Sequence, residues 1–307
     1  MDRNSPFYAQ VQLLMRVLPH LPKHECFALK GGTAINLFVR DLPRLSVDID
    51  LAYLPVNTRA EALADIRAHF DVLEQDLLAA VPGLRIQRPP ADRSDAQRLT
   101  LTHSRVQIKV ELSPVLRGTV WPVEVREVTP AVESQFGYAA VPVVSLNDLY
   151  AGKICAALDR QHPRDLFDIK LLLENEGISR DLLRTFLVYL ISHDRPIAEL
   201  LAPAHKDIAG IYETEFRAMT AEVVALDALL EARERLVAGL FQIMTDRDRA
   251  FLLSVKSRSP DWSLLGFDGV AELPAVRWKL QNLARMSPER HATAVDRLRD
   301  VLFDSRG

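Results

Sequence analysis

The sequence contains only two cysteines in 307 residues, Cys26 and Cys155, and they lie far apart. This scarcity excludes a disulfide-bonded scaffold and a zinc module built on cysteines. The eight histidines show no spacing typical of zinc ligands, which also argues against a zinc site. Any metal chemistry is therefore expected to use carboxylate oxygens.

Long hydrophobic runs and low-complexity tracts are also absent. No stretch approaches the roughly 18 uninterrupted apolar residues of a membrane-spanning helix, and the N-terminal residues lack the blocks of a signal peptide. The 12 glycines and 18 prolines form no rich tract, and apolar residues make up 48% of the chain. These proportions exclude a disordered or fibrous chain and predict a cytoplasmic globular protein without a membrane segment.

Positive charge is not in excess, because 38 basic residues face 41 acidic ones and the formal net charge is −3. This balance argues against a protein covered with basic residues for nonspecific binding of nucleic acid. Basic residues gather locally in the segment 85–109. They are Arg85, Arg88, Arg93, Arg98, Arg105 and Lys109. Such a group indicates either a solvated hairpin edge, whose charges prevent edge pairing, or part of a surface that contacts RNA.

Chain length and pattern predict two domains. Residues 1–144 alternate helix and strand signals and predict a domain with a mixed β-sheet and flanking helices. Residues 145–307 carry helix signals only and predict an all-α domain. The fold class is therefore α+β. Strands are expected at 26–30, 45–54, 84–87, 97–103 and 105–112, and helices at 6–18, 33–39, 58–80, 145–160, 179–192, 219–243, 246–256, 274–285 and 287–303. A further helix is expected to start at His162-Pro163.

An acidic strand carries the strongest chemical signal. In a strand over 45–54, Ser46, Asp48 and Asp50 share one face and the residues between them point into the core. Two carboxylates at this spacing can converge on a divalent cation, and such hard oxygen ligands suit Mg²⁺ or Mn²⁺. The alternative is a solvent-facing strand that happens to be acidic. A third carboxylate is expected from a neighbouring strand, where Glu111 fits, although it could be an ordinary exposed residue.

A glycine pair lies upstream of the acidic strand, in Gly31-Gly32-Thr33, between a predicted strand and a predicted helix. Glycines allow the backbone to approach a phosphate closely, and the start of a helix offers unpaired N–H groups. Many turns contain two glycines, so this motif alone is weak. Together with the acidic strand it predicts a phosphate cradle beside a metal platform.

The helical half adds a lysine and two aspartates. Lys153 falls within the apolar stripe of the helix at 145–160, so its ammonium group needs a carboxylate or phosphate partner unless it reaches past the core to water. Asp165 and Asp168 share one face of the next helix. Asp165 can simply complement the helix dipole, whereas Asp168 can pair with Lys153.

Four motifs in this order resemble the AbiEii/MenT nucleotidyltransferase toxins, the toxin halves of bacterial toxin–antitoxin and phage-defence pairs, which have a polymerase-β-like nucleotidyltransferase fold. The motifs are Lys30-Gly31-Gly32-Thr33-Ala34, Arg44-x-Ser46-x-Asp48-x-Asp50-Leu51, Ala151-Gly152-Lys153-x-x-Ala156 and Arg164-Asp165-x-x-Asp168.

The resemblance implies a role for each matching residue. The glycine motif (Gly31, Gly32, Thr33) and Ser46 would hold the triphosphate of an NTP, and Asp48 and Asp50 would bind Mg²⁺ or Mn²⁺. Lys153 would neutralise phosphate charge, and Asp165 or Asp168 would complete the site. Glu111 would be the third metal ligand. Its Val-Glu-Leu setting matches the family less well than the other motifs do.

The resemblance also implies an activity and partners. Related toxins transfer nucleotides to the 3′ acceptor end of tRNA, which blocks aminoacylation and growth, and a cognate antitoxin neutralises them. Basic residues of segment 85–109, together with Arg277 or Lys279, are expected to contact the acceptor. Two alternatives stay open: the acceptor is a side chain of a protein partner, or the fold is a non-catalytic module that binds nucleotides or partners.

Overall fold

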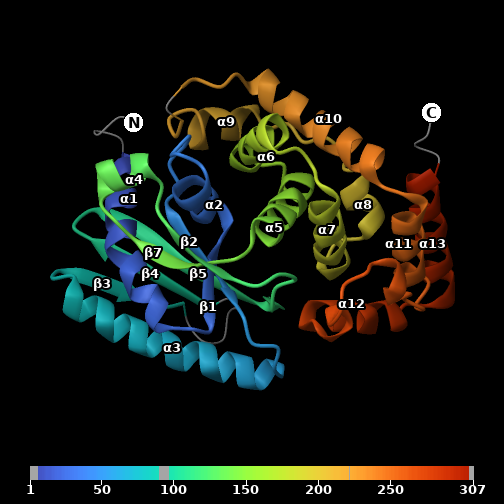
Figure 1. Cartoon of the computed structure of the whole chain (residues 1–307), viewed down its shortest axis with the longest axis horizontal. Coiled ribbons are helices and arrows are strands. Elements are labelled where there is room, and N and C mark those ends of the chain that lie inside the picture. The colour runs from blue at the N-terminus through green and yellow to red at the C-terminus, as the bar shows by residue number, and fades with distance from the viewer. Residues whose placement is uncertain (1–5, 90–96, 221, 304–307) are drawn as a thin grey trace. The chain divides into compact units, whose positions relative to one another are not determined.

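A computed structural model of the chain describes residues 6–89, 97–220 and 222–303 (Figure 1). The chain forms two compact units. The first comprises Met1–Ser145 and Glu213–Val224, and the second comprises Leu146–Tyr212 and Ala225–Gly307. The chain passes from the first unit to the second after Ser145, one residue from the expected boundary between 144 and 145. The sequence pattern did not predict that residues 213–224 belong to the first unit.

The first unit is built on a seven-stranded mixed sheet. β1 pairs in parallel with β7, and β2 with β5, whereas the other neighbouring pairs are antiparallel. The order across the sheet is β3 (Leu84–Gln87), β4 (Gln97–His103), β5 (Val106–Arg117), β2 (Asp48–Tyr53), β1 (Phe27–Lys30), β7 (Ala140–Val143) and β6 (Glu124–Glu127). The mixed sheet and the α+β class are confirmed.

Helix α3 (Arg59–Ala80) covers one face of this sheet (Figure 1). It begins at the predicted capping box, in which Thr58 and Glu61 each accept a hydrogen bond from the other's backbone N–H. The ring of Phe70 packs against that of Phe27, with centroids 5.6 Å apart. Since side chains alternate along a strand, the even-numbered positions of β1 and β2, including Asp48 and Asp50, lie on the opposite face.

Short helices complete the first unit. They are α1 (Pro6–Val17), the 3₁₀ helix η1 (Leu18–Lys23), α2 (Gly31–Ala34), the π-helix η2 (Ile35–Val39) and α4 (Pro130–Phe136). The expected separate turn at Gly31-Gly32 is wrong, because α2 begins at Gly31 itself. The structure also contains a helix at 130–136 and strands at 124–127 and 140–143, which were not predicted from the sequence.

The second unit contains helices and no strand among the residues described. They are α5 (Leu146–Asp159), α6 (Pro163–Asn175), α7 (Arg180–Ser192), α8 (Ile197–Leu201), α10 (Leu226–Ile243), α11 (Asp246–Lys256), η3 (Trp262–Leu264), η4 (Val270–Glu272), α12 (Pro274–Ala284) and α13 (Pro288–Phe303). α9 (Ala209–Glu215) runs across the change of unit. The all-α character expected for this half is confirmed.

Three expected boundaries are wrong, each because of a contact distant in sequence. β2 begins at Asp48 rather than at residue 45, since Leu45 donates its N–H to the carbonyl of Met219. That contact holds residues 213–224 against the first unit, so the helix expected at 219–243 begins only at Leu226 and Val223 is 79% exposed. β5 continues beyond the expected end at residue 112 to Arg117, which pairs with Tyr53 of β2.

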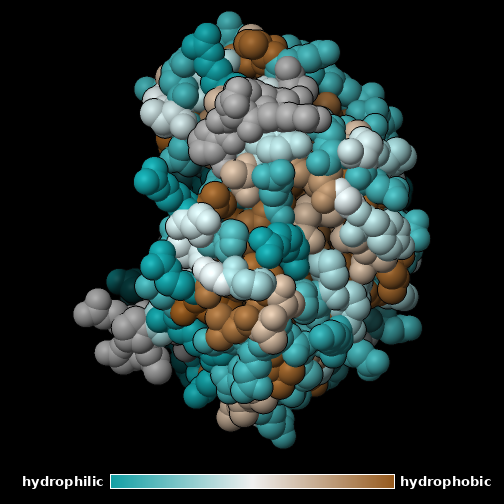
Figure 2. Space-filling view, turned by 90° about the vertical axis from the view of Figure 1, so that its left-hand side faces the viewer, coloured by the Kyte–Doolittle hydropathy of each residue, from teal (hydrophilic) through white to brown (hydrophobic). Residues whose placement is uncertain are grey.

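Hydrophilic residues dominate the face of the molecule seen in Figure 2, with smaller hydrophobic groups between them. Exposed apolar side chains include Val125, Tyr138 and Trp278. Scattered exposure of this kind is ordinary for a folded protein. None of the described helices is both long enough and apolar enough to cross a membrane.

Candidate active site

Asp48 and Asp50 lie on one face of β2, as the alternation predicts. Both are half-buried, whereas Ile49 between them is fully buried. In register, Asp50 stands between Lys30 of β1 and Glu111 of β5. Directly opposed residues on neighbouring strands point to the same face. Lys109 of β5 stands opposite Asp48 in the same way. The sheet therefore brings three carboxylates and the ammonium groups of Lys30 and Lys109 together on this face.

Glu111 has a partner of its own. Its Oε1 lies 2.5 Å from Nε of Arg98, the residue opposite it on β4. Both side chains are partly exposed, at 33% and 43%. The row across four strands is thus Lys30, Asp50, Glu111 and Arg98, with a cation on each side of two neighbouring carboxylates. Glu111 lies beside Asp50, where the third oxygen ligand is expected. To bind a metal ion, its carboxylate would have to leave Arg98 or contact Arg98 and the ion together.

The bend at Gly31 and Gly32, called the glycine bend below, lies directly against the side chain of Asp50. Gly31 has φ +74°, and a Cβ at this position would lie 2.2 Å from Oδ2 of Asp50. A Cβ on Gly32 would lie 2.7 Å from a guanidinium nitrogen of Arg44 and 2.9 Å from the hydroxyl of Ser46. Only glycine leaves room for these side chains to approach the backbone so closely. The predicted juxtaposition of bend, serine and carboxylate is present.

Thr33 ties the bend to the start of β2. Its hydroxyl donates to the carbonyl of Asp48 at 2.5 Å, and its oxygen lies 3.1 Å from that of Ser46. The side chain is fully buried. A contact between Thr33 and a phosphate, as expected from the resemblance, would therefore come from its backbone N–H. The buried hydroxyl positions the loop that carries Ser46 and Asp48.

Arg44 is a residue whose role the sequence reasoning missed, although the motif contains it. It is 2% exposed, donates to the carbonyl of Leu45 at 2.9 Å, and lies beside Gly32. It places a buried positive charge at the bend. Its position before the acidic strand, in Arg44-x-Ser46-x-Asp48, was a signal that could have indicated this role.

A substitution at Gly31 tests the close approach. Gly31→Ala forces an L side chain into the left-handed region, at a cost of about 1–2 kcal/mol in the free energy of unfolding. The added methyl group also has to displace the carboxylate of Asp50. We therefore expect the nucleotidyl transfer that the motif resemblance implies to fall well beyond what the loss of stability explains. Denaturant unfolding and transfer of labelled nucleotide measure the two effects.

Gly269→Ala is the matched control. Gly269 has the same φ of +74°, but a Cβ there would meet nothing within 4 Å. We expect similar backbone strain and unchanged transfer. If Gly31→Ala transferred nucleotide as well as Gly269→Ala, the contact between bend and carboxylate would have no part in the site.

The second unit holds its predicted residues in one buried ion cluster. Nζ of Lys153 in α5 lies 2.8 Å from Asp165 and 3.1 Å from Asp168, both in α6. The lysine is 7% exposed and both aspartates are fully buried. Arg160 donates two further hydrogen bonds to Asp165. The pairing expected between Lys153 and Asp168 is present, and Asp165 joins it.

The charges of this cluster decide the protonation of Asp165. Burial by itself raises the pKa of its carboxyl, but Lys153 and Arg160 outweigh burial and hold that pKa well below its ordinary value. Asp165 is therefore ionised at neutral pH, and it fixes the ammonium group of Lys153 in one place.

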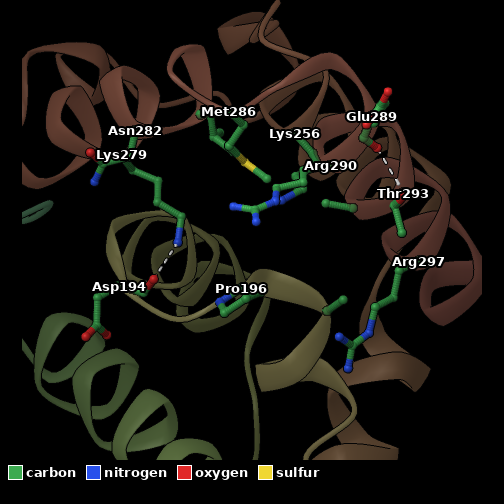
Figure 3. Close-up of a pocket in the computed structure, with 13 residues that line it drawn as sticks. Asp194, Pro196, Lys256, Lys279, Asn282, Met286, Glu289, Arg290, Thr293 and Arg297 are labelled. Carbon is green, nitrogen blue, oxygen red and sulfur yellow. Dashed lines mark hydrogen bonds between the residues drawn. The ribbon is translucent and has the colours of Figure 1, made fainter.

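The second unit also contains a basic pocket of about 500 Å³ between α12, α13 and the start of α8 (Figure 3). Lys256 lines it, is 6% exposed and has no carboxylate partner within the part of the chain that the structure describes. Burial lowers its pKa. Arg290 and Arg297 also line the pocket. A buried ammonium group without a carboxylate favours an anion beside it.

Lys279, expected to contact the acceptor, has a different role in this pocket. Its ammonium group donates to the carbonyls of His193, Asp194 and Arg195 just beyond the end of α7. Figure 3 shows the contact with Asp194. Burial and the nearby Lys256 lower its pKa to about 8. Lys279 therefore holds the end of α7 and is not free to bind a ligand. Arg277 is 63% exposed and lies 3.5 Å from Glu272.

Comparison with known proteins places these features in a family. No protein of curated function matches the sequence. Among solved structures, MenT4, a nucleotidyltransferase toxin from Mycobacterium tuberculosis H37Rv, matches with a TM-score of 0.60 at 16% identity, over 91% of this chain and 93% of that one. At this identity the match shows a shared fold. Residues 12–282 match the family described as nucleotidyl transferase AbiEii toxin, type IV toxin–antitoxin system. Since this match extends over most of its length, the chain belongs to the AbiEii nucleotidyltransferase toxin family.

Proposed function

We propose that this protein transfers nucleotides from an NTP to the 3′ end of an RNA in the cytoplasm, most simply the acceptor end of tRNA, and thereby inhibits translation and growth until a cognate antitoxin neutralises it. The observation that carries the proposal is the contact between the bend at Gly31 and the carboxylate of Asp50. It joins the two parts that such a reaction needs, a place for phosphates and a place for a cation.

The carboxylates suit a hard divalent cation. Asp48 and Asp50 are half-buried on one face, with Glu111 beside Asp50, and all three offer oxygen donors. Mg²⁺ or Mn²⁺ is the expected occupant. We propose that Asp48 and Asp50 hold it, with Glu111 as the third ligand. When bound, the ion would neutralise charge on the triphosphate and activate the attacking hydroxyl.

The chain's own residues supply the positioning. The backbone at Gly31 and Gly32 can approach a phosphate because neither residue carries a Cβ, and Arg44 adds a positive charge beside the bend. Ser46 offers a hydroxyl at the same place. Lys153, held by its two aspartates, is proposed to stabilise the negative charge of the phosphates. Positioning and charge neutralisation are what phosphoryl transfer chiefly requires of a protein.

The acceptor is identified by incubating the protein with each of the four labelled NTPs, Mg²⁺, and either total tRNA or a candidate protein partner. Label on RNA supports the proposal. Label on protein would show instead that the acceptor is a side chain of the protein partner. Absence of label with every nucleotide and acceptor would favour a non-catalytic module of the same fold.

We propose that the basic pocket contacts RNA phosphates, because Lys256 has no carboxylate partner among the described residues and the exposed Arg290 and Arg297 line the same pocket, Arg297 also lying 3.3 Å from Glu199. The segment 85–109 contributes less than its composition suggests. Arg88 pairs with Asp71 and Glu74, and Arg98 pairs with Glu111. Arg85, Arg105 and Lys109 are exposed. Arg93 lies outside the described residues.

Salt dependence of RNA binding tests this role. The double variant Arg290→Gln/Arg297→Gln removes two cations, and we expect weaker binding and a slope of log K against log salt that is smaller by about 1–2. Arg299→Gln is the control, since Arg299 is an exposed arginine of the same helix that pairs with Asp296 and does not line the pocket. An unchanged slope in the double variant would exclude the pocket from RNA binding.

A further inference from the structure

A second group of metal-ligand side chains lies at the other end of β1 from the glycine bend. Cys26 immediately precedes β1, while Asp65 and His69 lie one turn apart on α3. One ligand atom from each of the three lies within 4.8 Å of the other two, and all three residues are half-buried. β1 and β2 are antiparallel, with Phe27 opposite Tyr53 at one end and Lys30 opposite Asp50 at the other. The cluster therefore lies at the opposite end of the strand from Asp50.

Two neighbouring residues orient the candidate ligands. The hydroxyl of Tyr53 donates to Oδ2 of Asp65 at 2.7 Å, which leaves Oδ1 directed toward His69, 3.6 Å from its Nε2. On the other side of the same ring, Nδ1 of His69 lies 2.9 Å from Nδ1 of His24. If Nδ1 of His69 carries the proton and donates it to His24, Nε2 presents a lone pair toward Asp65. Support of this kind from outer residues is typical of metal-binding histidines.

The donor set selects the class of metal. A thiolate, an imidazole nitrogen and a carboxylate oxygen together suit Zn²⁺ and similar transition metals, whereas Mg²⁺ prefers oxygen ligands alone. One thiolate and one carboxylate would balance the two charges of the ion. Burial and the nearby Asp65 raise the pKa of the Cys26 thiol to about 12, so binding would release the thiol proton.

We propose that Cys26, Asp65 and His69 bind one divalent transition-metal ion, best matched by Zn²⁺, with a water molecule in the fourth position. His24 and Tyr53 are positioning residues for this site. The bound ion would join the residue that begins β1 to the middle of α3. Its effect is structural, because the site lies at the opposite end of the strand from Asp50.

Cobalt binding to the full-length protein tests the site. Metal-free, reduced protein is titrated with Co²⁺, and we expect thiolate-to-cobalt charge-transfer absorption in the near ultraviolet with one equivalent bound, which Zn²⁺ displaces. His69→Gln should weaken binding by more than about 100-fold and Tyr53→Phe by about 10- to 100-fold. Zn²⁺ should raise the melting temperature of the wild type and leave that of Cys26→Ala unchanged.

Two controls separate this site from the rest of the molecule. Cys155→Ala removes the other thiol and should retain the absorption band, as should Asp48→Asn, which alters only the proposed magnesium site. Absence of the band in the wild type would overturn the proposal. So would a band that is lost with Cys155→Ala or that survives both Cys26→Ala and His69→Gln.

Discussion

Asp48→Asn should lower the rate of nucleotidyl transfer by about 10²–10³-fold or more while the protein stays folded. The substitution keeps the size of the side chain and removes the charge that would hold a divalent cation and, through it, the triphosphate. The contact that Thr33 makes at this position is to the backbone carbonyl of Asp48, so the loop should keep its conformation. Transfer of labelled nucleotide at saturating NTP and RNA measures the effect, and circular dichroism and thermal melting check the fold.

Asp71→Asn is the control for removing a carboxylate from the same unit. Asp71 is 60% exposed and pairs at the surface with Arg88, an interaction of little energetic weight. We expect transfer at the wild-type rate. An Asp48→Asn protein that still labelled RNA at that rate would remove the basis for the proposed metal site.

The role of Glu111 can be separated from its ion pair in the same assay. Glu111→Gln removes both a possible ligand and the partner of Arg98, whereas Arg98→Gln removes only the ion pair. If Glu111 binds the metal, Glu111→Gln should raise the Mg²⁺ concentration needed for half-maximal transfer and Arg98→Gln should not. If both substitutions raised this concentration equally, Glu111 would act only as the ion-pair partner of Arg98.

Lys153→Met should reduce the free energy of unfolding of the protein by about 3–5 kcal/mol. The loss is large because Asp165 and Asp168 are fully buried and would lose the ammonium group that lies 2.8 Å and 3.1 Å from their carboxylates. Denaturant unfolding measures it. Nucleotidyl transfer by the fraction that stays folded should also fall, since the proposed phosphate-stabilising charge is gone.

The pH dependence of stability gives a second readout of this cluster. The pKa of Asp165 is lowered by folding, so its contribution is complete above its ordinary value of 3.8 and is lost as the pH falls toward the folded-state value. We expect the wild type to lose stability below about pH 4 more steeply than Lys153→Met.

Lys170→Met is the matched control for the lysine. Lys170 pairs with Glu174 one turn along α6 in a partly exposed position, where such pairs contribute about 0.2–0.5 kcal/mol. A Lys153→Met protein as stable as Lys170→Met would contradict the role of Lys153 as the central cation of the buried cluster.

Signals within a few residues of each other could be interpreted from the sequence alone. The capping box of Thr58 and Glu61 starts α3 as predicted, because both hydrogen bonds form within one turn of helix. The alternation of Asp48, Ile49 and Asp50 correctly assigned each to a face of the sheet. The motifs also indicated the family, which the match over residues 12–282 confirms.

Contacts between distant segments could not be predicted in the same way. The sequence predicted a long helix starting at residue 219, yet Met219 binds Leu45 and the helix begins at Leu226. Arg44 was visible in its motif, but its position against Gly32 depends on how the loop before β2 folds back.

What the sequence determined by itself is the set of local elements and the residue types that bear chemistry, because helix caps and strand alternation depend on neighbours along the chain. Only the tertiary structure decided which of these residues meet. The pairing of β2 with β5 puts Glu111 beside Asp50, and the packing of α3 near the start of β1 brings Asp65 and His69 to Cys26. Register and packing are set by burial of the whole core, which no short segment of sequence contains.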